Sequence, residues 1–113
     1  MTLEEVARKL GLEVLVGADL GLEVRGGYVG DLLSRALADS EEGSLWITHQ
    51  RHLNVVAVAK LKGLAGVVYA QGVRPYEEAL ERAREEGVNL LSSGRSAFET
   101  AGLLFRILRE KSD

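Results

Sequence analysis

The sequence predicts an α/β fold, a three-layer single domain in which a mostly parallel sheet carries helices on both of its faces. From residue 31 onward, helical and strand-like segments alternate in the order α-β-α-β-α-β-α. Such alternation is typical of parallel strands joined by right-handed helical crossovers. The 113 residues are the size of one ordinary domain, and no linker or low-complexity tract divides them. Residues 1–113 are therefore expected to form one domain.

Composition excludes several classes of protein. The chain has no cysteine, which excludes disulfides, thiolate metal sites and cysteine nucleophiles. A net charge of −3, the lack of a basic block and an aromatic content of 5% argue against nucleic acid as a partner. The N-terminus is polar and amphipathic, unlike a signal sequence, and no apolar run approaches the ~20 residues that cross a membrane. We expect a cytoplasmic protein with no membrane segment and no cofactor.

A short helix and two strands are expected in the N-terminal part. Thr2 is a suitable N-cap for a helix whose apolar residues recur at helical spacing until Gly11 ends it. Residues 12–16, LEVLV, then have the composition of a strand. After the turn-rich GADLG, residues 22–25 are expected to form a second, short strand.

The next helix is expected to begin at Asp31, in the segment DLLSRALADSEE. The segment GGYVGD (26–31) leads into it, and Gly43 is its expected end. Aspartate is a favoured N-cap residue, so Asp31 is interpreted as a helix cap rather than as a general base. Tyr28 lies between glycines and is expected to pack within the fold rather than face a ligand.

Residues 44–48, SLWIT, are expected to form a strand, with its tryptophan in the core. The apolar segment 53–61 that follows has two interpretations, a helix from His52 to Lys62 or a strand that turns at Lys62-Gly63. The helix is favoured because alanines suit it and the neighbouring units are βα. A helix in this segment is apolar almost all round, so it must be covered on two sides.

The clearest helix runs from Pro75 to Gly87, with proline in its first turn and an apolar stripe that includes Tyr76. Residues 88–92 form the next expected strand, and a last helix runs from about Ala97 to Glu110. Its apolar stripe is broader than one contact with a sheet requires. The stripe consists of Phe98, Ala101, Leu103, Leu104, Phe105, Ile107 and Leu108.

Three loops are expected at one edge of the sheet, because the carboxyl ends of parallel strands lie together. They are THQRH (48–52), AQGVRP (70–75) and SSGRS (92–96), and each contains one arginine before a helix. Helix N-termini and arginines suit a small anionic ligand, such as a nucleotide or a phosphorylated compound. The alternative is that these arginines are only solvated surface and the serines only helix caps. The candidate ligand-binding residues are Thr48, His49, Gln50, Arg51, His52, Gly72, Arg74, Ser93, Gly94 and Arg95.

No catalytic or metal-binding motif was found. The phosphate loops GxxxxGK[ST] and GxGxxG and the nucleophile motif GxSxG are absent. His49 and His52 are three residues apart, but no third histidine or neighbouring carboxylate completes a metal site. A hydrogen-bonding loop, with His52 near a helix start, is favoured over a catalytic base, and we predict a protein that is not an enzyme.

The chain resembles the DRTGG-domain family over about residues 22–108. The resemblance depends on YVGDLLS, LWITHQRHLNVVAVA, the turn from Gly72 to Pro75, and a small polar loop that leads to SAFETAG. The string DRTGG itself does not occur. This resemblance implies an α/β unit similar to the N-terminal domain of HPr kinase. It implies no kinase activity, because the half of HPr kinase that carries the phosphate loop is missing.

In that family the domain is fused to CBS domains in pyrophosphatases and occurs within phosphotransacetylases, where it resembles a regulatory or dimer-forming module. Free-standing copies occur beside redox enzymes such as hydrogenase subunits. Our first hypothesis is therefore a non-catalytic regulatory module that forms a homodimer through the excess apolar surface of helices 52–62 and 97–110 and binds a small anion. The second is a protein-interaction subunit of a larger enzyme complex. The third is a small hydrolase or transferase that uses His49 or His52.

Overall fold

The computed structural model describes residues 1–112 and confirms the three-layer α/β architecture. Its sheet has five strands in the order β1-β5-β4-β3-β2. Strand β1 is antiparallel to β5, and the other three pairs of neighbouring strands are parallel. The strands are β1 Glu13–Val16, β2 Gly26–Val29, β3 Ser44–Thr48, β4 Gly66–Tyr69 and β5 Leu90–Ser92.

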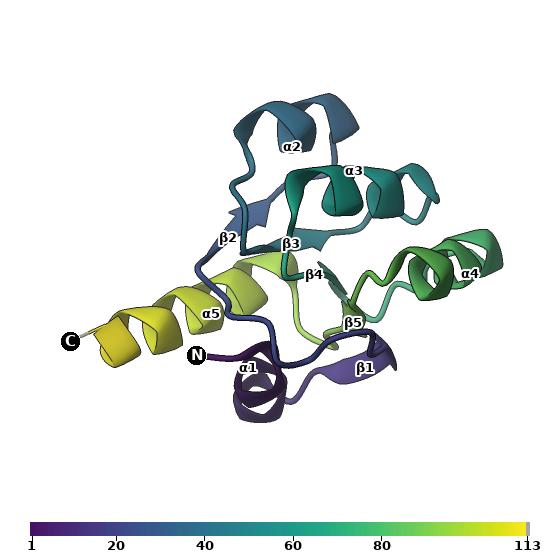
Figure 1. The fold of residues 1–113 in the computed structure, drawn as a ribbon. Coiled ribbons are helices and arrows are strands. Elements are labelled where there is room, and N and C mark those ends of the chain that lie inside the picture. The colour runs from purple at the N-terminus through teal and green to yellow at the C-terminus, as the bar shows by residue number, and fades with distance from the viewer. Residues whose placement is uncertain (113) are drawn as a thin grey trace.

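Five helices cover the two faces of this sheet (Figure 1). On one face lie α2 (Leu33–Asp39), α3 (Asn54–Lys62) and α4 (Glu77–Glu86), and on the other lie α1 (Leu3–Leu10) and α5 (Ala97–Ser112). Successive residues of a strand point to opposite faces. In β3, Trp46 belongs to the core under α2, α3 and α4, whereas Leu45 and Ile47 belong to the core under α1 and α5.

The first helix and the first strand are confirmed. Thr2 and Glu5 form a capping box, in which the backbone N–H of Glu5 donates to the Thr2 hydroxyl at 3.3 Å. Gly11 ends the helix in the left-handed conformation, with φ of 66°. This arrangement places α1 directly before the edge strand β1.

The prediction of a strand at residues 22–25 is wrong, because the second strand is the following segment, Gly26–Val29. Within 22–25, Glu23 only forms an isolated bridge with Thr2. The glycines of β2 are typical of a loop, which is why the strand was not predicted. Gly27 has a packing role, since a Cβ atom there would lie 3.0 Å from Leu104 Cδ2. Glycine at this position lets α5 lie close to the edge of the sheet.

The boundaries predicted for the second helix are also wrong. Helix α2 begins at Leu33 rather than Asp31, and its N-terminus has no side-chain cap. It ends at Asp39, where the hydroxyl of Ser40 donates to a carbonyl one turn earlier. Gly43, with φ of 82°, instead lies in the turn that enters β3. The helix ends early because Ser40 is extended, with φ of −74° and ψ of 148°, although its backbone N–H still donates to the carbonyl of Ala36.

Segment 53–61 is helical, so the hairpin alternative is wrong. Helix α3 ends at Gly63, whose φ of 64° and backbone N–H close the last turn. Its buried side chains include Val55 and Val56, and α3 packs between α2 and α4. The cover that this apolar helix requires is thus mostly supplied within the chain, although Leu61 is 74% exposed.

Two details of the later helices differ from prediction. Helix α4 begins at Glu77, so Pro75 precedes it, and Tyr76 lies at its N-cap rather than on the buried stripe. On α5, Leu104 is buried but Phe98 and Phe105 are 88% and 64% exposed. The broad stripe of α5 therefore contacts the sheet along one side only. Within residues 1–112, no helix is long and apolar enough to cross a membrane.

Candidate functional site

The three loops that follow β3, β4 and β5 lie against one another at the carboxyl edge of the sheet, as predicted. The backbone N–H of Tyr76 donates to the carbonyl of Arg51 at 3.2 Å, which joins the first two loops. The N–H of Gly72 donates to the carbonyl of Ser93 at 2.9 Å, which joins the second loop to the third. The three loops thus form one surface, beneath which Thr48 and Ser93 are buried.

Asp31 connects the end of β2 to the THQRH loop. Its carboxylate accepts hydrogen bonds from the Thr48 hydroxyl at 2.8 Å and the His49 backbone N–H at 2.7 Å. The second carboxylate oxygen lies 3.2 Å from Nδ1 of the His49 ring. The side chain of Gln50 donates to the Asp31 carbonyl at 3.3 Å. The prediction that Asp31 caps α2 is wrong, because its carboxylate is already bound to the neighbouring strand and loop.

These contacts lower the pKa of Asp31. Partial burial raises the pKa of this carboxyl, but the hydrogen bonds from His49 and Thr48, with the charge of the His49 ring, outweigh it. The pKa therefore lies below its ordinary value of 3.8. A carboxyl with a lowered pKa stabilises the fold at pH values above its unfolded pKa. That contribution is lost as the pH falls through the folded pKa.

The variant Asp31→Asn is expected to lower the free energy of unfolding by about 1–2 kcal/mol at pH 7, because it removes charge-assisted hydrogen bonds. The side chain is 53% exposed, which keeps the effect small. The difference from wild type should shrink as the pH falls below 3.8, where the wild-type carboxyl also becomes neutral. Urea unfolding at pH 7 and at successively lower pH measures this, and a difference that is independent of pH contradicts it.

Two buried polar side-chain atoms in residues 1–110 have no hydrogen-bond partner, and both belong to residues at the carboxyl end of their strands. They are Nε2 of His49 and the hydroxyl oxygen of Tyr69, the last residue of β4. Tyr69 is fully buried, and burial raises the pKa of its hydroxyl. Thr48, which precedes His49, pairs with Tyr69 in the neighbouring strand. Unsatisfied buried polar groups are rare in native proteins and need a specific explanation.

The three arginines do not converge on one point. The guanidinium of Arg51 lies 4.3 Å from the centre of the Tyr76 ring, and its Nε donates to the carbonyl of Arg74. Arg74 instead forms an ion pair with Glu13 of β1 at 3.1 Å. Arg95 donates at 2.6 Å to a carbonyl at the C-terminal end of α1. Among these three residues, Arg51 alone stacks on a side chain of the shared loop surface.

The smaller polar candidates mostly organise the loops. Nδ1 of His52 accepts a hydrogen bond at 3.1 Å from a backbone N–H at the start of α3, as expected of a helix-start residue. The hydroxyl of Ser96 accepts from the N–H of Glu99 at 3.1 Å, so it caps α5. The buried Ser93 hydroxyl lies 2.8 Å from that of Thr100. These residues fix the shape of the surface.

Two further features of this surface are its unusual backbone conformation and the open space beside two glycines. Gln71 and Gly72 both have positive φ, 57° and 69°, and the conformation of Gln71 is uncommon for a residue with a side chain. Strained backbone of this kind is often found at functional sites. A Cβ atom on Gly72 or on Gly94 would meet nothing within 4 Å, so both glycines border open space.

Three residues of this site were not among the candidates predicted from the sequence: Asp31, Tyr69 and Tyr76. Tyr76 was expected on a buried helical stripe but is 47% exposed beside Arg51. Had β2 been recognised, the position of Asp31 just beyond its carboxyl end would have been the signal. For a metal site there is no support, since no group of three or more metal-ligating His, Asp or Glu side chains occurs in the described residues.

Comparison with known proteins supports the fold. No protein-family model matches the chain, and no curated protein matches it in sequence. The fold is similar to the crystal structure of the CBS and DRTGG domains of the regulatory region of Clostridium perfringens pyrophosphatase, complexed with its activator, diadenosine tetraphosphate. The TM-score is 0.74 at 14% identity, over 91% of this chain and 45% of that one. This chain thus spans less than half of its structural relative and has a DRTGG-like α/β fold.

Proposed function

We propose that this chain, residues 1–113, is a single-domain, non-catalytic regulatory module that senses a small anionic ligand at the carboxyl edge of its sheet and acts as a homodimer. The observation that carries the ligand site is the pair of buried polar atoms without partners, His49 Nε2 and the Tyr69 hydroxyl. The N-terminus of α4 adjoins the same loops and has no side-chain cap. Its first backbone N–H groups favour an anion.

The stacked pair of Arg51 and Tyr76 favours a nucleotide over a simple anion. A guanidinium offers a fork of donors that matches phosphate oxygens, while its plane stacks on aromatic rings. Tyr76 is about half exposed, so part of its ring is accessible for contact with a base.

Regulation is favoured over catalysis by two observations. The structurally similar pyrophosphatase segment is a regulatory region with a bound activator, diadenosine tetraphosphate. In addition, the His49 ring lies against the Asp31 carboxylate through Nδ1, and His52 Nδ1 accepts a backbone N–H at the start of α3, so both histidines have structural roles. A hydrolase or transferase that uses His49 or His52 therefore ranks last among our hypotheses.

The proposal predicts that one ligand class raises the unfolding midpoint of the protein. The panel comprises adenine and guanine nucleotides, diadenosine tetraphosphate, acyl phosphates and inorganic phosphate. A ligand at a hundred times its dissociation constant adds about 2.7 kcal/mol to the native state, a shift of several degrees. Arg51→Ala and His49→Ala should abolish the shift. Arg82→Ala, a matched change on the exposed face of α4, should preserve it. A panel without any shift contradicts the ligand site.

The second candidate function is a protein-interaction subunit of a larger enzyme complex, such as a redox or hydrogenase-associated one. The exposed phenylalanines of α5 favour it, because a large exposed apolar patch usually marks a contact with another protein. Co-purification at native expression levels distinguishes the two functions. A stable partner enzyme favours the interaction subunit, whereas a homodimer without other proteins favours the regulatory module.

A further inference from the structure

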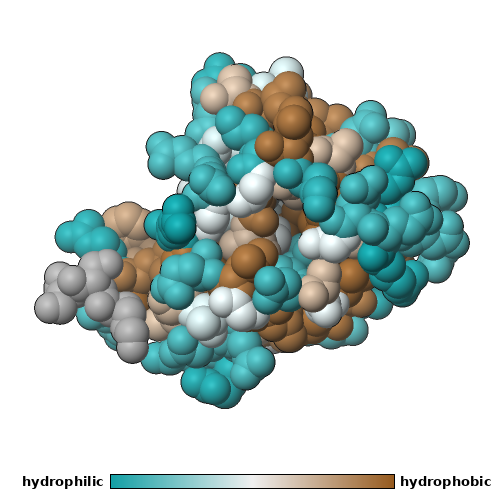
Figure 2. Space-filling model, in the orientation of Figure 1, coloured by the Kyte–Doolittle hydropathy of each residue, from teal (hydrophilic) through white to brown (hydrophobic). Residues whose placement is uncertain are grey.

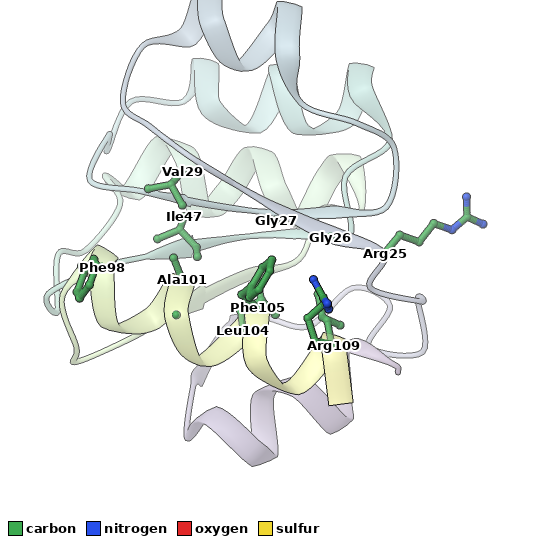
Figure 3. A pocket seen from close by; sticks show the side chains of 12 residues that line it. Arg25, Gly26, Gly27, Val29, Ile47, Phe98, Ala101, Leu104, Phe105 and Arg109 are labelled. Atoms are coloured by element: carbon green, nitrogen blue, oxygen red, sulfur yellow. The ribbon is translucent and has the colours of Figure 1, made fainter. Parts of the chain in front are cut away.

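An apolar groove lies between the edge strand β2 and helix α5. It has a volume of about 640 Å³. Gly27 and Val29 line it from β2, and Phe98, Ala101 and Phe105 line it from α5 (Figure 3). Figure 2 shows apolar surface along α5, beside the hollow that separates this helix from α2. No residue of the proposed ligand site lines this groove.

The phenylalanines of the groove are exposed to an unusual degree. Phe98 and Phe105 are 88% and 64% exposed. Each has a large apolar ring whose burial would be favourable. They lie seven residues apart on one side of α5, which is two helical turns. Figure 3 shows Phe98 at one end of the groove and Arg109 at the other, with Phe105 between them. Such a stripe indicates a contact outside the chain.

Gly102 is a second and independent indication. It lies inside the long helix α5, where glycine is the poorest helix former except for proline. A Cβ atom at this position would meet nothing within 4 Å, so nothing in the fold requires glycine there. Glycine at a position where the fold itself does not require it is explained if the backbone of another molecule approaches closely there.

The arrangement along α5 is self-complementary. Phe98 and Phe105 lie symmetrically on either side of Ala101 and Gly102 in the sequence. If two copies of α5 pair in antiparallel fashion, the small residues meet at the crossing point and each Phe98 lies against the partner subunit's Phe105. A two-fold axis generates such a contact from a single surface.

The charges on α5 favour the same orientation. Glu99 is exposed in the N-terminal half of the helix, and Arg109 is exposed in the C-terminal half. The guanidinium of Arg109 lies 5.5 Å from the centre of the Phe105 ring, at the end of the stripe. Antiparallel pairing directs Glu99 toward the C-terminal half of the other helix, where Arg106 and Arg109 outnumber Glu110, whereas parallel pairing places like charges side by side. This charge complementarity fits a second copy of the same chain.

We propose that a second copy of this chain docks in the groove between β2 and α5, with the two α5 helices antiparallel and crossing at Ala101 and Gly102. This inference rests on the homodimer of the proposed function and names its surface. The phenylalanines of each copy fill the groove of the other. The carboxyl-edge loops lie outside this contact surface, so ligand binding and self-association can be tested separately.

Sedimentation velocity at micromolar concentration tests the surface. The wild-type chain should sediment as a dimer, and the double variant Phe98→Ser with Phe105→Ser as a monomer with an unchanged circular dichroism spectrum, because both side chains are exposed. Leu61→Ser is the matched control on α3, since Leu61 is 74% exposed and lies outside the groove. A monomeric wild type overturns the homodimer itself. A double variant that is still a dimer overturns only the surface.

Disulfide trapping tests the orientation, because the chain has no cysteine of its own. A mixture of the Phe98→Cys and Phe105→Cys variants should cross-link rapidly under mild oxidation, whereas either variant alone should cross-link at least tenfold more slowly. Equal cross-linking by Phe98→Cys alone contradicts antiparallel pairing about this axis.

The Gly102→Ala change tests the crossing point. It should raise the unfolding midpoint in the monomeric double-serine background by a few degrees and weaken the wild-type dimer at least tenfold. A dimer that tolerates alanine there overturns the crossing point.

Discussion

Replacing Asn89 by alanine is expected to lower the free energy of unfolding by about 3–5 kcal/mol, through the loss of three hydrogen bonds made by a buried side chain. The Asn89 side chain accepts from the backbone N–H of Asp19 at 2.8 Å and donates to the carbonyl of Asp19 at 2.8 Å. It also donates to the carbonyl of Ala65 at 2.9 Å. One buried amide thereby holds the loop after β1 against the segments that enter β4 and β5.

The midpoint of thermal unfolding should fall by roughly 10–20 °C in this variant. Asn54→Ala is the matched control, because the side chain of Asn54 is exposed at the start of α3 and alanine is a good helix former. Its effect should stay within about 0.5 kcal/mol. A loss of less than about 1 kcal/mol for Asn89→Ala means that water replaces the amide, and it contradicts the role given to this residue.

The second large effect is expected for Trp46→Ala, which should cost about 3–5 kcal/mol because it opens a cavity in a packed core. Trp46 is fully buried in β3, in the core under α2, α3 and α4. Its indole N–H donates to the carbonyl of Gly30 at 2.8 Å and so fixes the carboxyl end of β2 beside β3. Chemical unfolding of the purified variant measures the loss.

Trp46→Phe separates the volume of the side chain from its hydrogen bond. Phenylalanine fills most of the space but leaves the carbonyl of Gly30 without its donor, so we expect a loss of about 1–2 kcal/mol. Because Gly30 precedes Asp31, this variant should also weaken the hold of Asp31 on the THQRH loop. If the two variants are equally destabilised, the hydrogen bond and not the core volume dominates, which contradicts this account.

The order of the elements could be predicted because most of their signals are local. The capping box at Thr2, the glycine that ends α4 and the apolar strand 44–48 each depend on neighbouring residues only. The parallel order of β3, β4 and β5 then follows from their helical connections. For this reason the three loops of the candidate site were correctly expected at one edge of the sheet.

The contacts that define the site could not be predicted, because they join residues far apart in the sequence. Strand β2 was missed since its glycines are typical of a loop, and the reason for glycine at position 27 is the close approach of α5. Asp31 has the sequence context of a helix cap, yet it binds the end of β3 seventeen and eighteen residues later. The side chains of Arg74 and Arg95 bind to β1 and α1. Local sequence patterns do not predict where these two elements lie relative to the loops.

The apolar width of α5 was visible in the sequence, but its division into two sides was not. Helical spacing places Phe98, Leu104 and Phe105 on one broad stripe. Which of them is buried depends on where the sheet ends, and β2 is the last strand. Leu104 reaches Gly27, whereas both phenylalanines stay exposed beside the groove.

The central claim, that the carboxyl-edge loops bind an anion, is tested most directly by NMR. Amide shifts of the ¹⁵N-labelled protein are recorded during a titration with diadenosine tetraphosphate, with ATP and inorganic phosphate as comparisons. We predict saturable shifts in residues 48–52, 71–76 and 93–96, while the amides of α5 beyond Ala101 stay in place. Shifts confined to β2 and α5, or no shifts at millimolar ligand, would contradict the claim and leave the α5 face as the functional surface of the chain.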